Sequence, residues 1–80
     1  MTKFNGHKNW NHWNVSLWIN NDEVLYSIAR RLVRIHRGKL PAAMAMMQHL
    51  KEEAGVTHTP DGAPYSTSSI RAAMFDMRSE

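Results

Sequence analysis

The chain has 80 residues, a hydrophobic fraction of 42%, no cysteine, and a formal net charge of +3 from ten Lys+Arg against seven Asp+Glu. This length predicts one domain, and the apolar fraction is ordinary for a folded protein, which excludes an intrinsically disordered chain. The lack of cysteine excludes disulfides and thiolate-bound metals, and it is typical of a reducing compartment.

Neither a membrane span nor a targeting segment is predicted. No apolar run approaches the roughly 18–20 residues that cross a bilayer. The first residues, Met1–Gly6, contain one lysine with no apolar stretch behind it, unlike a signal peptide. We therefore expect a cytoplasmic protein that does not contact a membrane.

The N-terminal segment, residues 1–9, is polar and contains glycine, so an extended arm is expected there. Apolar residues at positions 10, 13 and 17 then predict a first helix, with Asn9 or Asn11 as its cap. The polar triplet Asn20–Asp22 is suited to a turn and ends it.

The three tryptophans, each able to bury on the order of 150–250 Å², are the largest apolar side chains in the sequence. Trp13 and Leu17 share a helix face and are expected to anchor the core. For Trp10 and Trp18 a core position is preferred over a surface binding anchor.

A second helix is predicted to start at Asp22, an N-cap residue followed by Glu23. Gly38 is expected to supply a left-handed C-cap. The apolar stripe at helical spacing is Leu25, Ile28, Ala29, Leu32, and Ile35 or His36.

Pro41 suits the first turn of a third helix, and Gly55 is expected to end it. Its predicted buried face is Ala43, Met44, Met47, Leu50 and Ala54. Most methionines are expected to fill gaps in the core, and Met46, which lies off this face, is the candidate for exposure.

A loop at 56–65 separates the third helix from the last, and Thr59–Gly62 has proline and glycine where a type I turn favours them. Serines at 66–69 offer caps for the last helix, whose apolar face is Ile70, Ala73, Met74 and Met77. The prediction is an all-α fold: a compact bundle of about four short helices forming a single domain over 1–80, with a Trp/Leu/Ile core between its first two helices.

No enzyme, cofactor or metal site is predicted. The histidines, at 7, 12, 36, 49 and 58, form no His-Glu-x-x-His pair. Ser66, Ser68 and Ser69 lack a nucleophile motif and an evident His or Asp partner. Adjacent Glu52 and Glu53 point about 100° apart around a helix and cannot face each other as an acid–base pair.

Four arginines on the second predicted helix are the candidate partner-binding residues. Arg30, Arg34 and Arg37 follow at i, i+4 and i+7, and Arg31 lies beside them. Such a ridge can grip phosphates or an acidic protein patch, and the alternative is a solvated face that complements the helix dipole. We expect Arg30→Glu with Arg34→Glu to abolish function without changing the helical CD signal.

The stretch Trp13–Tyr26 reads W-N-V-S-L-W-I-N-N-D-E-V-L-Y. It resembles a signature, W-N-V-x-L-W-I-N-N-D-E-x-L-Y, of small proteins encoded by phages and related mobile elements. The resemblance extends to Asn5-Gly6 and Asn9 before it and to Thr59–Gly62 and Tyr65-Ser66 after it. Val24 stands where the pattern usually has glycine. The chain also resembles anti-CRISPR proteins directed at a type I (type I-C) system.

The resemblance implies a phage-derived inhibitor that binds a bacterial CRISPR effector complex in the host cytoplasm and blocks target DNA by steric occlusion. The basic charge argues against mimicry of DNA, which needs an acidic surface. The alternative is a small basic accessory protein that binds nucleic acid through the same arginines. Monomer and weak dimer both remain open.

Overall fold

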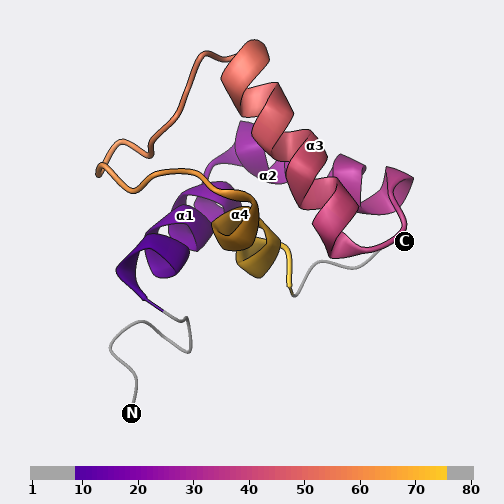
Figure 1. The fold of residues 1–80 in the computed structure, drawn as a ribbon, viewed down its shortest axis with the longest axis horizontal. Helices are drawn as coiled ribbons and strands as arrows, with labels where there is room; N and C mark the ends of the chain where they lie inside the picture. The colour runs from indigo at the N-terminus through magenta and orange to yellow at the C-terminus, as the bar shows by residue number, and fades with distance from the viewer. Residues whose placement is uncertain (1–8, 76–80) are drawn as a thin grey trace.

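The computed structural model describes residues 9–75, which form four helices joined by short connections and one longer loop (Figure 1). The helices are α1 (Trp10–Asn21), α2 (Glu23–Ile35), α3 (Lys39–Glu52) and α4 (Thr67–Ala73). The prediction of a single all-α domain of about four short helices is confirmed. Of the expected arm over residues 1–9, all but Asn9 lies outside the described residues.

Polar side chains at the N-termini explain where three helices begin. Asn9 accepts the backbone N–H of His12 at 3.0 Å, so it is the cap of α1. Asp22 accepts two N–H groups at the start of α2, each at 3.0 Å. Ser66 caps α4 through a reciprocal capping box with Ser69. Such caps satisfy backbone donors that a helix leaves unpaired at its N-terminus.

Gly38 has a different role from the one predicted. The cap of α2 is His36, in extended conformation, and Gly38 precedes α3 as its N-cap with φ 97° and ψ 157°. This is a region that is open essentially to glycine alone, rather than the left-handed helical region of a C-cap. Gly38 therefore makes the reversal between α2 and α3.

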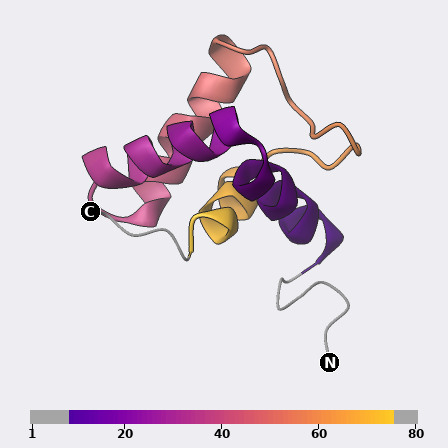
Figure 2. The same ribbon diagram turned by 180° about the vertical axis from the view of Figure 1, so that it is seen from behind.

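The four helices form two layers. In Figure 1 α3 and α4 lie in front of α2 and α1, and the view from behind in Figure 2 reverses the order. Each helix packs against two others: α1 on α2 and α4, and α3 on α2 and α4. Within the described residues the backbones of α1 and α3 are not adjacent, and neither are those of α2 and α4. The helices thus enclose the core as a closed ring.

The core is made of aliphatic side chains, two methionines and one tyrosine from all four helices and the last loop. Five of its members are alanines, which let the helix backbones approach closely, and no tryptophan is among them. The buried residues are Val15, Ile19, Ala29, Val33, Ala42, Ala43, Met46, Leu50, Ala63, Tyr65, Ile70, Ala73 and Met74.

The predicted Trp/Leu/Ile core is therefore wrong for α1. Leu17 is 38% exposed, Trp10 is 40% exposed, and Trp13 and Trp18 are half-buried. Apolar residues surround this helix on nearly all sides, so their spacing does not define one face. The face that packs inward carries Asn14, Val15 and Ile19.

The predicted stripe of α2 ends with Ile35 or His36, and the structure has His36 half-buried and Ile35 64% exposed. Val33, which is not part of that stripe, is buried. Met44 is 57% exposed, whereas Met46, the candidate for exposure, is fully buried. Ala43 and Leu50 are buried as predicted, whereas Ala54, beyond the end of α3, is exposed. Ile70, Ala73 and Met74 are buried as predicted, and Met77 lies outside the described residues.

No helix within residues 9–75 combines the length and apolar character that crossing a membrane requires.

Candidate binding surfaces

The residues of the signature-like stretch hold the loop after α3 against α1. Asn14, on α1, is almost fully buried and donates from Nδ2 to Oδ2 of Asp61 at 2.9 Å. Its Oδ1 accepts the hydroxyl of Thr59 at 2.6 Å. The indole Nε1 of Trp18 donates to the same Asp61 oxygen at 2.9 Å. These bonds join residues more than forty positions apart in the chain.

The turn predicted at Thr59–Gly62 is confirmed, with Gly62 N–H donating to the Thr59 carbonyl at 2.9 Å. The hydrogen bond from Asn14 lowers the pKa of the Asp61 carboxyl most, and the hydrogen bond from Trp18 lowers it further. Both donors stabilise the ionised carboxylate. Asn14, Trp18 and Asp61 thus hold the loop after α3 against α1.

The arginine surface lies on the outer side of α2. We define it by Tyr26, Arg30, Arg31, Arg34, Ile35 and the adjoining Arg37. At 100° per residue, Arg30, Arg34 and Arg31 occupy the middle of the exposed side. Tyr26 lies along one margin and Ile35 along the other. Both are exposed, at 36% and 64%.

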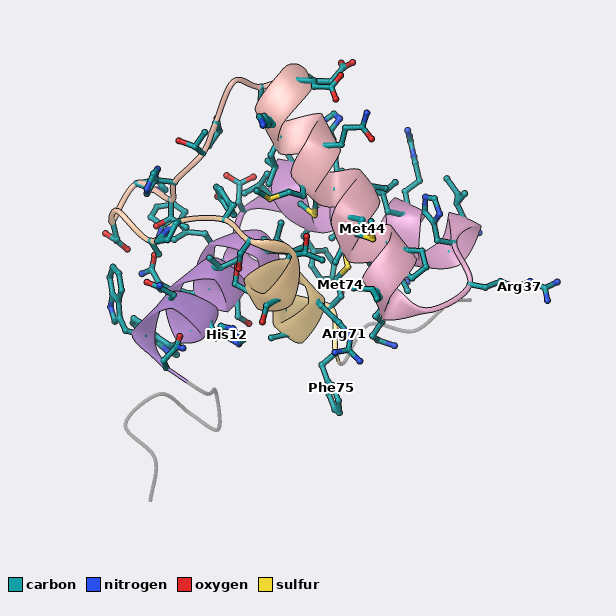
Figure 3. The ribbon with its side chains drawn as sticks, viewed as in Figure 1. His12, Arg37, Met44, Arg71, Met74 and Phe75 are labelled. Carbon is teal, nitrogen blue, oxygen red and sulfur yellow. The ribbon has the colours of Figure 1, made fainter. Side chains whose placement is uncertain are left out.

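The four arginines are not equivalent. Arg30 is half-buried, with its guanidinium 5.9 Å from the centre of the Tyr26 ring, a cation–π distance. Arg31 and Arg34 are exposed on the helix. Arg37 lies beyond the end of α2, so it does not continue the helical ridge as predicted, and it points away from the body of the protein (Figure 3).

Charge is unevenly distributed around the arginine surface. Arg31, Arg34 and Arg37 form no ion pair with any other residue of 9–75. The carboxylates in that range lie at the α1–α2 corner, at the end of α3 and in the loop after it: Asp22, Glu23, Glu52, Glu53 and Asp61. The α2–α3 connection, far from the end of α3 in Figure 1, is therefore a basic end of the molecule.

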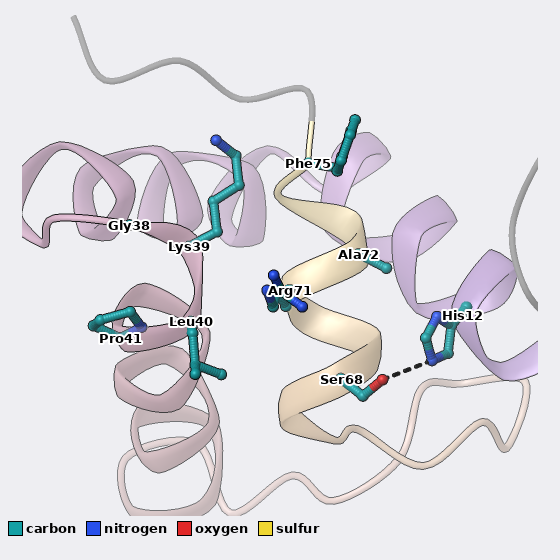
Figure 4. A pocket seen from close by; sticks show the side chains of 9 residues that line it. All are labelled: His12, Gly38, Lys39, Leu40, Pro41, Ser68, Arg71, Ala72 and Phe75. Atoms are coloured by element: carbon teal, nitrogen blue, oxygen red, sulfur yellow. Dashed lines mark hydrogen bonds between the residues drawn. The ribbon is translucent and has the colours of Figure 1, made fainter.

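A groove of about 620 Å³ crosses α4 between the first turn of α3 and α1 (Figure 4). Arg71 lies at its middle, Leu40 on one side and His12 on the other, with Phe75 at one end. Phe75 and Leu40 are 75% and 50% exposed. Sequence analysis missed this groove because residues far apart in the chain line it.

Ser68 has a histidine partner, contrary to the prediction. Its Oγ lies 3.0 Å from Nε2 of His12 at the edge of the groove. A serine nucleophile also needs an oriented base and donors for the oxyanion. None of the five carboxylates within 9–75 lines this groove. The contact joins α4 to α1, while Ser66 and Ser69 bond each other in the capping box, as the capping interpretation requires.

A second depression of about 500 Å³ lies where the loop after α3 meets the α1–α2 corner, and Trp18, Val24, Val56 and Tyr65 contribute to its lining. Burial raises the pKa of the Tyr65 hydroxyl, and the negative charge of Asp22 raises it further. Val24 is 66% exposed at this depression.

The described residues contain no group of three or more His, Asp or Glu side chains placed to share a metal ion. His7 lies outside them.

A family model described as a family of unknown function (DUF7249) matches residues 1–80. No curated protein and no solved structure matches the chain. The match spans the four helices, the loop held by Asn14, the arginine surface and the groove across α4, and on this ground the chain belongs to the DUF7249 family.

Proposed function

We propose that this protein acts by binding another macromolecule through the arginine surface of α2, as a phage-derived inhibitor of a bacterial type I CRISPR effector complex. The observation that carries the binding role is the set of exposed guanidinium groups, Arg31, Arg34 and Arg37, without ion pairs among residues 9–75 and flanked by exposed apolar side chains. The inhibitor role rests on the resemblance of Trp13–Tyr26 to proteins of phages and mobile elements.

The composition of this surface favours a protein partner. Arginine and tyrosine are enriched in protein interfaces, where guanidinium groups pair with carboxylates in bidentate geometry. Ile35 and Tyr26 offer apolar area that a phosphate backbone does not use. An acidic patch bordered by apolar residues, on an effector subunit, complements this surface, and occupation of that patch blocks target DNA sterically.

A nucleic-acid partner is the second candidate, because the same three arginines can neutralise phosphates. In that case the logarithm of the affinity for DNA falls with the logarithm of the salt concentration, by about 0.9 for each phosphate contacted. An inhibitor that binds protein needs no affinity for free DNA.

The decisive experiment is a pull-down of the tagged protein from a host lysate that contains a type I effector, with nuclease added. Recovery of effector subunits after nuclease treatment supports the inhibitor, whereas retention on free DNA at low salt without recovery of effector contradicts it. The double variant Arg31→Glu/Arg34→Glu should lose the effector. Arg31→Glu takes the place of Arg30→Glu in this double variant, because the guanidinium of Arg30 packs on the ring of Tyr26.

Lys51→Glu is the control for the single variant Arg34→Glu, since each change lowers the net charge by two and Lys51 is an exposed cation on α3 outside the arginine surface. Lys51→Glu should retain the effector, whereas Arg34→Glu should bind it more weakly. Equal loss in these two single variants would mean that overall charge, rather than the arginine surface, governs binding.

A further inference from the structure

The groove across α4 combines exposed apolar side chains with cations. Its lining contains no residue of the arginine surface, although Gly38 and Lys39 also line a depression next to Arg34, Ile35 and Arg37. Its apolar lining comes from Leu40, Pro41 and Phe75, and its basic groups are Arg71 and Lys39 (Figure 4). Phe75 is 75% exposed and Leu40 is 50% exposed, although nearby Ala73 and Met74 are buried. Large apolar side chains left exposed together around a concave surface mark a site of interaction.

The positive charge of Arg71 indicates which kind of ligand the groove can bind. Arg71 is exposed on the outer side of α4, and in Figure 4 it lies between Leu40 and Ser68 at the middle of the groove. No carboxylate of residues 9–75 lines the groove to neutralise it. A ligand that fills the groove therefore brings its own negative charge, because a guanidinium covered by an apolar ligand alone loses hydration without compensation.

A second copy of this chain meets that requirement poorly. In a two-fold dimer formed through this face, each Arg71 and Lys39 would approach the same cations of the other copy. Like charges placed opposite each other in an interface oppose association. A nucleic acid would supply the negative charge, but Leu40 and Pro41 offer aliphatic area rather than the aromatic platforms on which bases stack.

We propose that this groove binds an acidic peptide segment of a partner protein that carries large aliphatic side chains. The aliphatic side chains pack between Leu40 and Phe75, and the flanking carboxylates pair with Arg71 and Lys39. This is the helix-in-groove mode of peptide recognition, with apolar anchors on one face of the ligand and charge at its margin. The proposal does not depend on the function assigned to α2.

The test uses the full chain and a fluorescein-labelled peptide in which two leucines at i and i+4 are flanked by glutamates. Fluorescence anisotropy at low ionic strength measures its affinity. A matched peptide with glutamine in place of every glutamate should bind about tenfold more weakly or worse. Equal affinity of the two peptides would overturn the proposal, since charge would then play no part.

Two pairs of variants locate the site. Arg71→Glu and Phe75→Ser should each weaken the acidic peptide about fivefold to tenfold, because the first reverses the pairing charge and the second removes the apolar contact. Lys51→Glu and Val24→Ser make the same kinds of change outside both the groove and the arginine surface, and they should leave the affinity unchanged. All four side chains are exposed, so the far-UV CD spectrum should stay that of the unchanged protein.

Three other outcomes would contradict the proposal. If the peptide responds to Arg34→Glu and not to Arg71→Glu, it binds the arginine surface and the groove proposal is wrong. Sedimentation as a dimer that Phe75→Ser dissociates would assign the groove to a second copy. Displacement of the peptide by a single-stranded oligonucleotide, lost in Arg71→Glu, would assign it to nucleic acid.

Discussion

The side chain of Asn14 joins α1 to the loop after α3 by donating to Asp61 and accepting from Thr59. The Thr59 hydroxyl in turn accepts the N–H of Ala63, which is fully buried. Replacement of Asn14 leaves the hydroxyl of buried Thr59 without its acceptor, whereas exposed Asp61 keeps the hydrogen bond from Trp18.

We therefore expect Asn14→Ala to lower the free energy of unfolding by about 1–3 kcal/mol. Urea denaturation followed by CD measures the change. Gln48→Ala is the control, because Gln48 is exposed on α3 and forms no hydrogen bond with another residue of 9–75. Equal stability of the two variants would show that the network contributes nothing to folding.

Asp61 links stability to acidity. Its pKa is lowered in the folded protein by the hydrogen bonds from Asn14 and Trp18. A carboxylate with a lowered folded pKa contributes stability above its unfolded pKa, about 3.9, and loses that contribution as the pH falls through the folded pKa. Stability should thus decline as the pH drops below about 4.

Asp61→Asn should make this decline shallower, because the amide does not titrate. Urea midpoints measured from neutral to acidic pH, for both proteins, test the expectation. Glu53→Gln is the matched control and should keep the original slope, since Glu53 is exposed and lies outside the network of Asn14, Trp18 and Asp61. An unchanged slope in Asp61→Asn would contradict the assignment.

At the level of helices, the sequence predicted the N-terminal caps well, but it predicted the C-terminal cap at Gly38 and the buried faces less well. Asn9, Asp22 and Ser66 are local signals, because a cap acts on N–H groups two or three residues away. Burial depends on which helix lies opposite. Trp13 and Leu17 share a face of α1, yet α2 and α4 pack on a neighbouring face, and no spacing within α1 contains that information.

Among the candidate surfaces too, the sequence predicted what depends on neighbouring residues and missed what depends on helix packing. The arginines of α2 are close in sequence, so Arg30, Arg31 and Arg34 could be placed on one side of a helix. Arg37 was misplaced because α2 ends before it. The contact of Ser68 with His12 joins positions that only the packing of α4 on α1 brings together.

Gly38 determines how α3 returns along α2. Its φ of 97° with ψ 157° is strained for any residue with a Cβ, whereas the space around it is not restrictive, since an added Cβ would meet Pro41 Cδ at 3.7 Å. Gly38→Ala should lower the free energy of unfolding by about 1–3 kcal/mol through the backbone alone. Thermal denaturation followed by CD measures the loss.

Gly55→Asn is the companion variant. Gly55 has φ 64°, in the left-handed region that asparagine tolerates, and nothing lies within 4 Å of an added Cβ. Its effect should be clearly smaller than that of Gly38→Ala. A larger effect at Gly55 would mean that the end of α3, rather than the α2–α3 reversal, constrains the fold.

For the molecule as a whole, the ring of contacts makes the short α4 indispensable. Like α2, α4 packs on both α1 and α3, and it does so through buried Ile70, Ala73 and Met74. A domain of this size without disulfides rarely exceeds roughly 3–5 kcal/mol of stability. Opening one side of the ring should therefore unfold all of it, and transitions recorded by far-UV CD and by tryptophan fluorescence should coincide.

Ile70→Ala tests this dependence directly. Ile70 is fully buried, and truncation of a buried isoleucine to alanine costs about 2–5 kcal/mol. That loss equals most of the stability expected of the whole domain, so the variant should be largely unfolded by CD at room temperature. Ile35→Ala removes the same atoms from a side chain that is 64% exposed and should remain folded. If Ile70→Ala loses only the signal of one short helix while the tryptophan fluorescence stays native, then α4 is an appendage and α1 to α3 fold without it.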